Sequence, residues 1–211
     1  MKDKTIIITG ASRGIGNFLM KKFDNKDYEI IGTYNATEPN ASNKSDFVKI
    51  DISDFYAVES FVEKIKEQLG GVILLNCAAI NYNSFAHKSD INQWKNVIDV
   101  NLVGTFNMIR VLLPTMRKNN FGRIVNFSSV VAQSGVIGTS AYAASKSALW
   151  GLSKCIAVEN ATKGITINTL NLGYFNIGMI SDVPPNLQGL IKQKIPTGEF
   201  GNPENLYNAV R

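Results

Sequence analysis

The stretch Thr9-Gly10-Ala11-Ser12-Arg13-Gly14-Ile15-Gly16 decides the fold, because it joins an apolar strand to an amphipathic helix. The predicted strand, residues 5–9, reads Thr-Ile-Ile-Ile-Thr, and Ile15, Leu19 and Phe23 share one face of the helix that follows. The three glycines allow a tight turn and let a phosphate approach backbone N–H groups at the helix N-terminus. Strand, glycine-rich turn and helix together predict a dinucleotide-binding unit, and a tight turn without a ligand is the alternative.

The same alternation of strand and helix continues outward from this turn. Amphipathic helices are predicted around Val58–Leu69 and at residues 91–118 and 141–163. Short β-branched runs predict strands buried on both faces, at residues 29–33, 47–50, 72–76, 123–127 and 165–170. This order predicts an α/β fold of Rossmann type, a doubly wound parallel sheet with helices on both faces.

Two segments depart from the alternation. Residues 35–46 are rich in turn formers and predict a loop or a single turn instead of a crossover helix. Residues 173–203 are rich in Gly, Pro and Asn, with a weak helical pattern at 187–195. We interpret this second segment as a flexible loop over a substrate site, and a surface excursion is the alternative.

Composition excludes several classes of protein. The chain has 211 residues, 45% hydrophobic and 18% charged, as in a globular protein, and no cluster among its 22 Lys and Arg suggests nucleic acid or membrane as a partner. No apolar run approaches the roughly 20 residues of a membrane span, and no signal peptide is evident. Two cysteines and one histidine lack metal-ligand spacing, so no metal is expected. A cytoplasmic, soluble protein is the expectation.

A second motif suggests acid–base chemistry. Tyr142 and Lys146 lie four residues apart in a predicted helix and therefore share a face. A neighbouring cation lowers the pKa of a phenol towards neutrality, where it can exchange protons. Ser129 follows the predicted strand 123–127, at the sheet edge where ligands bind in open parallel sheets. Without Ser129, an exposed helical pair would be the simpler interpretation.

At this point the sequence resembles the short-chain dehydrogenase/reductase family, and NADPH-dependent 3-oxoacyl-carrier-protein reductases most closely. Four motifs match in order and spacing: the T-G-x-x-x-G-x-G turn, the pair Asp51-Ile52, Asn101, and Ser129 with Tyr142 and Lys146. The resemblance covers almost the whole chain. It implies one dinucleotide-binding domain over residues 1–211, with the catalytic residues built into it.

The resemblance implies catalytic roles for four residues. Tyr142 would give a proton to the substrate carbonyl, and Lys146 would lower the phenol pKa and hold the nicotinamide ribose. Ser129 would hydrogen-bond the substrate oxygen. Asn101 would hold a water that links Lys146 to solvent.

It also implies a cofactor-binding set. Asp51 would meet the adenine amino group with Ile52 beside the ring, and Asn76-Cys77-Ala78-Ala79 would line the cofactor. Cys77 and Ala79 depart from the family pattern in that turn. Leu172 and Ile177 replace the Pro and Thr that hold the nicotinamide amide in the family, so main-chain atoms of Phe175 would have to hold it. The expected cofactor residues are Gly10, Ser12, Arg13, Gly14, Ile15, Gly16, Asn35, Asp51, Ile52, Asn76, Ala78, Tyr142, Lys146, Gly173 and Phe175.

The choice of cofactor depends on the end of the second strand. An acidic residue there would bind the ribose of NAD and repel a 2′-phosphate, but none occurs before Glu38. Arg13 offers a guanidinium fork for that phosphate, and Ser12 and Asn35 offer neutral hydrogen bonds. NADP(H) is therefore expected to be preferred over NAD(H). In the alternative, Arg13 is merely exposed and Glu38 plays the acid.

These observations predict an NADPH-dependent carbonyl reductase acting on a 3-oxoacyl thioester, in some cases carrier-bound, or a similar ketone. The alternatives are an NAD-dependent alcohol or sugar dehydrogenase and a non-catalytic nucleotide-binding relative. The resemblance further implies a homodimer or homotetramer formed through the helices at 91–118 and 141–163. Relatives continue with a last strand, so we expect Arg211 not to be the natural end of the functional chain.

Overall fold

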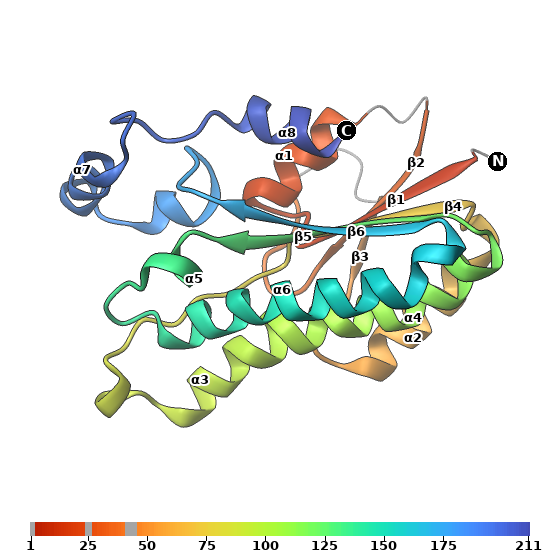
Figure 1. The fold of residues 1–211 in the computed structure, drawn as a ribbon, viewed down its shortest axis with the longest axis horizontal. Helices are drawn as coiled ribbons and strands as arrows, with labels where there is room; N and C mark the ends of the chain where they lie inside the picture. The colour runs from red at the N-terminus through yellow and green to blue at the C-terminus, as the bar shows by residue number, and fades with distance from the viewer. Residues whose placement is uncertain (1–2, 24–26, 41–45) are drawn as a thin grey trace.

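The protein contains a parallel sheet flanked by two layers of helices (Figure 1). The computed structural model describes residues 3–23, 27–40 and 46–211. In this part of the chain the strand order is β3-β2-β1-β4-β5-β6. The strands are β1 (Lys4–Thr9), β2 (Glu29–Tyr34), β3 (Phe47–Lys49), β4 (Gly71–Asn76), β5 (Gly122–Ser129) and β6 (Ile165–Leu172). The order reverses beside β1, so the prediction of a doubly wound Rossmann-like sheet is confirmed.

Alternating side chains of the central strand β1 pack into two hydrophobic cores, one on each face of the sheet. Ile7 of β1 packs with residues of α2, α4 and α6, whereas Ile6 and Ile8 pack on the opposite face with Leu19 and Leu206 of α1 and α8. Figure 1 accordingly shows α2, α4 and α6 on one side of the sheet and α1 and α8 on the other. These helices are α1 (Gly14–Lys22), α2 (Phe55–Ile65), α4 (Thr105–Lys118), α6 (Ser140–Asn160) and α8 (Pro203–Val210).

The long predicted helix at 91–118 is continuous but not uniform. It consists of α3 (Ile91–Ile98), a π-helical segment η4 (Asp99–Gly104) and α4. Such wide turns often occur at functional sites. By length and composition this helix could cross a membrane. Four fully buried residues of its α4 part nevertheless lie in the core against the sheet: Met108, Ile109, Leu112 and Met116.

The segment after β6 forms a closed excursion. It contains η6 (Gly178–Asp182) and α7 (Pro185–Lys194), which agrees with the weak helix predicted at 187–195. Backbone hydrogen bonds from Gly201 to Tyr174 (2.8 Å) and from Asn176 to Gly201 (3.2 Å) join its two ends. The described residues after β6 form no further strand of the sheet.

The loop after β2 is only partly described. Residues 35–40 contain no helix, as the turn-rich sequence predicts. The rest of that prediction falls largely on residues 41–45, which lie outside the described residues. Four short elements complete the description of these residues: the 3-10 helices η2 (Lys66–Gln68), η3 (Ala86–Lys88) and η5 (Ala161–Lys163), and the helix α5 (Val131–Ser134).

Candidate active site

A cavity of about 920 Å³ opens at the carboxyl ends of the strands. Residues directly after or at the ends of five strands line it, as expected for an open parallel sheet: Gly10, Asn35, Cys77, Ser129 and Gly173. η6 and α7 also contribute to its wall. Its volume is near the upper end of the roughly 300–1,000 Å³ usual for ligand and cofactor pockets.

The glycine-rich turn forms one end of the cavity. Gly10 has φ +63°, and a Cβ added there would lie 2.7 Å from the Cα of Ala78. A Cβ on Gly16 would lie 2.4 Å from the Gly10 oxygen, so α1 could not start so close to β1 with any side chain there. No side chain caps the N-terminus of α1 in the described structure, and its first N–H groups face a site suited to an anion.

The charges around the cavity favour an anionic ligand. Among the described residues that line it, Asp51 is the only carboxylate, against the cations Arg13, Lys146 and Lys194. One oxygen of Asp51 already accepts hydrogen bonds from the backbone N (2.9 Å) and hydroxyl (2.6 Å) of Ser53. The glycine cradle, the uncapped helix and this balance of charge together fit the phosphates of a dinucleotide.

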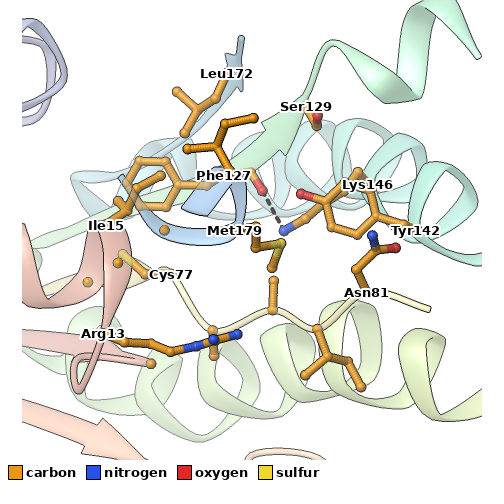
Figure 2. Close-up of a pocket in the computed structure, with 18 of the residues that line it drawn as sticks. Arg13, Ile15, Cys77, Asn81, Phe127, Ser129, Tyr142, Lys146, Leu172 and Met179 are labelled. Carbon is orange, nitrogen blue, oxygen red and sulfur yellow. Dashed lines mark hydrogen bonds between the residues drawn. The ribbon is translucent and has the colours of Figure 1, made fainter. Parts of the chain in front are cut away.

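The other end of the cavity brings together the three residues expected to act on the substrate (Figure 2). Tyr142 and Lys146 lie one turn apart on α6, and the Lys146 Nζ is 5.7 Å from the centre of the Tyr142 ring. The Ser129 side chain acts on Tyr142 closely enough to lower the pKa of its phenol. Ser129 is the last residue of β5, which runs two residues past its predicted end at Phe127.

Burial shifts the pKa values of both Tyr142 and Lys146. It raises the pKa of Tyr142 above its ordinary value, although the Ser129 side chain partly offsets the shift. It also lowers the pKa of Lys146 to about 8, because the ammonium is almost completely buried. The net shift of the Tyr142 pKa is upward because desolvation outweighs the effect of Ser129, and the lowering of the phenol pKa by Lys146 stays a prediction. At neutral pH Tyr142 carries its proton and most Lys146 side chains are charged.

The departure at Cys77 places a thiol beside the lysine. Cys77 lines the cavity, and burial raises the pKa of its thiol. The thiol is therefore protonated at neutral pH, which fits the interpretation of Cys77 as a small apolar filler.

Asn101 lies behind the cavity. It is fully buried in η4, where its amide oxygen accepts a 2.8 Å hydrogen bond from the Ile80 N. Its amide nitrogen donates to the Ile80 oxygen (2.9 Å) and to the hydroxyl of Ser145 (3.1 Å), the neighbour of Lys146. Asn101 thus joins a cavity-lining loop to α6 but does not itself line the cavity.

Asn76 is the one residue of the expected cofactor set whose side chain lies away from the cavity. Its side chain points into the sheet layer and donates a 2.8 Å hydrogen bond to Asn126, its partner in the β4–β5 register. Asn126 in turn donates to Ser153 (3.0 Å), whose hydroxyl contacts that of Thr169 (2.7 Å). Asn76 therefore belongs to a buried polar chain and does not line the cavity. All other expected cofactor residues do line it.

Sequence reasoning missed two parts of the wall. Near the glycine-rich turn these are residues of β2 and the loop after it, where the position after a predicted strand was a usable signal: Thr33, Tyr34, Ala36 and Thr37. In the other part the missed residues are apolar and come from the loop before α6, which carries no motif: Val136 and Ile137. Met179, Leu187 and Leu190 also line the cavity, and they fall in the segment 173–203 that was interpreted as a loop over a substrate site.

With its proton in place, Tyr142 can protonate an oxygen that becomes negative, and Ser129 can donate a second hydrogen bond to it. A dinucleotide bound along the cavity from the glycine-rich turn would end beside this pair. Together, fold and site define an oxidoreductase that uses a dinucleotide.

Comparisons with known proteins identify the family. The profile of the short chain dehydrogenase family matches residues 4–188, and the chain belongs to that family. Acetoacetyl-CoA reductases of Rhizobium meliloti (strain 1021) and Shinella zoogloeoides are 36% and 34% identical over 99% of this chain and 89% of their own length. The 3-oxoacyl-[acyl-carrier-protein] reductase of Escherichia coli (strain K12) is 32% identical over 99% of this chain and 88% of its own.

Proposed function

We propose that this protein reduces the ketone of a 3-oxoacyl thioester with NADPH. The observation that carries the proposal is the placement of Ser129, Tyr142 and Lys146 in one cavity with the glycine-rich turn. The relatives support the substrate class, since they are named for acetoacetyl-CoA and 3-oxoacyl-carrier-protein reduction.

Bound NADPH supplies a hydride from C4 of its nicotinamide ring. Tyr142 gives its phenolic proton to the carbonyl oxygen, and the Ser129 hydroxyl donates a hydrogen bond to the same atom. The Lys146 ammonium stabilises the phenolate that Tyr142 becomes. Asn101 positions the α6 turn next to Lys146 through Ser145, and a water held near it would return a proton from solvent.

The cofactor end supports NADPH over NADH. The end of β2 and the loop after it contribute Thr33, Tyr34, Asn35, Ala36 and Thr37 to the cavity, and none of these carries a carboxylate. Glu38 is exposed and does not line it. Arg13 does line it, so a guanidinium would face a 2′-phosphate.

The substrate end supports an acyl group. Beside Tyr142 the wall is formed mainly by apolar side chains, several of which remain exposed at the mouth: Val136, Ile137, Leu187 and Leu190. Lys194 lies among them and could meet a phosphate of a thioester carrier. We further propose that segment 173–203 opens and closes over this end, where η6 and α7 form the wall.

We also propose a cytoplasmic homo-oligomer. The two long helices carry exposed apolar side chains that a second copy of the chain would cover. These are Val103 in η4, Phe106 in α4 and Val158 in α6. Light scattering of wild type and of Phe106→Glu tests the assignment. A lower mass for the variant is expected, and an unchanged oligomer would contradict it.

The decisive test follows cofactor oxidation with a panel of carbonyl compounds. Acetoacetyl-CoA, 3-oxoacyl carrier protein and simple ketones are offered with NADPH or NADH, and alcohols and sugars with the oxidised cofactors. Fastest turnover with a 3-oxoacyl thioester and NADPH is expected. Turnover of alcohols or sugars with NAD alone would favour an NAD-dependent dehydrogenase, and no turnover with any pair would favour a nucleotide-binding role.

A separate titration tests the cofactor preference. A charge-assisted contact between Arg13 and a 2′-phosphate contributes about 1.5–3 kcal/mol, which corresponds to roughly ten- to a hundredfold in affinity. NADPH should therefore bind more tightly than NADH by that factor, and Arg13→Ala should remove most of the difference. Equal affinities in the wild type would contradict this assignment.

A further inference from the structure

The glycine-rich turn and the segment over the cavity touch at two points. An Arg13 guanidinium nitrogen lies 3.6 Å from a carboxylate oxygen of Asp182, the last residue of η6. Next to it, the backbones of Gly14 and Gly178 meet: a Cβ on Gly14 would lie 3.0 Å from the Gly178 Cα. A side chain at position 14 would crowd this approach, and both glycines have positive φ, +55° and +76°, a conformation that other residues rarely adopt. η6 therefore rests on the N-terminus of α1.

η6 is also fastened to α7. The side-chain amide of Gln188 in α7 donates to the backbone oxygens of Ile180 (3.1 Å) and Val183 (2.8 Å), at the middle and the end of the η6 turn. The bridge between Phe175 and Gly201 closes the segment behind them. A displacement of Asp182 is thus transmitted to the apolar wall of the substrate end, which includes Leu187 and Leu190.

The ion pair uses the guanidinium that the proposed function assigns to the 2′-phosphate. A phosphate group carries more negative charge than a carboxylate and offers three strong acceptor oxygens. The Arg13–Asp182 pair is mostly exposed on both sides and longer than a close hydrogen bond, so it is weak and replaceable. Carboxylate and phosphate compete for one cation.

We propose that Asp182 is an internal counter-ion of Arg13 and a specificity-determining residue of the cofactor site. It holds η6 on the glycine-rich turn until a ligand with a 2′-phosphate takes its place on Arg13. A ligand that lacks this phosphate leaves the pair intact. Binding of the phosphorylated cofactor therefore frees the η6–α7 segment, and the other cofactor does not. The inference rests on the proposed preference for NADPH.

The first experiment titrates purified wild type, Asp182→Asn, Arg13→Ala and the double variant with NADPH and NADH by fluorescence. Asp182→Asn should tighten NADPH about two- to fivefold, the range expected for loss of an exposed ion pair, and leave NADH unchanged. The gain should vanish when Arg13 is absent. A gain that persists in the Arg13→Ala background would reveal simple repulsion between Asp182 and the phosphate and would overturn the counter-ion role.

A matched control removes another exposed ion pair. Glu63 on α2 pairs with Lys66, and Glu63→Gln makes the same change of charge without touching the cavity. It should leave both affinities as in the wild type. If the wild type binds NADPH and NADH equally, the cofactor preference fails. If it prefers NADPH but Asp182→Asn changes nothing, only the counter-ion role fails.

The second experiment measures hydrogen exchange of the amides in residues 178–191. In the wild type, adenosine 2′,5′-bisphosphate should speed exchange there, whereas adenosine 5′-monophosphate should not. Asp182→Asn without ligand should already exchange faster, and the two nucleotides should then act alike. Unchanged exchange in ligand-free Asp182→Asn would overturn the proposal whichever cofactor the enzyme prefers.

Discussion

The Nζ of Lys146 donates a 2.8 Å hydrogen bond to the backbone oxygen of Phe127, two residues before Ser129 on the same strand (Figure 2). A second hydrogen bond joins the same two elements: the Ser128 hydroxyl donates to the backbone oxygen of Lys146 at 2.9 Å. The end of β5 therefore carries Ser129 and also fixes the α6 residue that works with it. The relative positions of Ser129, Tyr142 and Lys146 follow from one strand–helix contact.

Substitution of Tyr142 by Phe removes the phenolic hydroxyl and little else. Because the proton donor is lost, kcat should fall by about 10²- to 10⁴-fold while the dissociation constant of NADPH stays within about twofold. Steady-state kinetics and fluorescence titration check the two expectations. Tyr56→Phe, at an exposed position on α2, is the matched control. More than a tenth of wild-type activity in Tyr142→Phe would refute its assignment as the acid.

The burial of Lys146 predicts how stability changes with pH. Its pKa is about 8 in the folded protein and 10.5 as the ordinary value, so between these pH values the unfolded chain binds the extra proton. Stability from this residue is therefore lowest below pH 8 and rises towards pH 10.5, in total by an amount on the order of 3 kcal/mol.

Lys146→Met removes this titration and provides the comparison. Urea unfolding of both ligand-free proteins between pH 7 and pH 10 should show the wild type gaining stability relative to the variant as pH rises above about 8. The variant also leaves the Phe127 oxygen without its donor, but that loss does not depend on pH. A difference that stays constant across this range would mean that the ammonium is not desolvated.

Substitution of Gly16, which is tightly packed, and of Gly151, which has open space around it, tests the role of the glycine-rich turn. Gly16→Ala would place a Cβ 2.4 Å from the Gly10 oxygen, so the turn must move, and affinity for NADPH should fall at least about tenfold. Gly151→Ala lies on an exposed part of α6 with no atom within 4 Å of the new Cβ, and should stabilise the protein by roughly 0.5–1 kcal/mol. Thermal unfolding checks the expected gain in stability of Gly151→Ala, and cofactor titration checks the expected loss of affinity in Gly16→Ala. Equal NADPH affinities for Gly16→Ala and wild type would exclude a tight turn at the phosphate.

The buried chain through Asn126 should matter for stability more than for chemistry. Asn126→Ala removes two side-chain hydrogen bonds at a fully buried position, and each abandoned partner costs about 1–3 kcal/mol. We expect denaturant unfolding to show a loss of this size per partner, with cofactor affinity of the folded protein unchanged. Asn168→Ala, at an exposed position of β6, should change stability by less than about 0.5 kcal/mol. An equal loss in both variants would contradict the role of the chain.

The sequence was sufficient to predict the sheet and most of the site because both depend on local signals. Apolar β-branched runs predict the strands, and the residues that follow parallel strands meet at one edge. Arg13, Asn35 and Gly173 were located in this way. The orientation of the Asn76 side chain could not be read from the sequence, because at a strand end only the pleat decides whether a side chain faces the cavity or the sheet layer. It faces Asn126.

Other features depend on contacts between distant segments and leave no local signal. The pair Arg13–Asp182 joins the first turn of the fold to a loop near the other end of the chain. The pKa of Tyr142 depends on how deeply α6 packs, which the spacing of Tyr142 and Lys146 does not contain. The π-helical turn of η4 likewise interrupts a pattern that predicts one uniform helix.

The position of β1 in the sheet has a consequence for synthesis on the ribosome. β1 is made first but is central, paired with β2 on one edge and with β4 on the other. Until Gly71–Asn76 has left the exit tunnel, one edge of this very apolar strand has no partner. The nascent chain therefore passes through a stage at which an apolar strand edge is open to wrong pairing, and chaperones have a defined window in which to act.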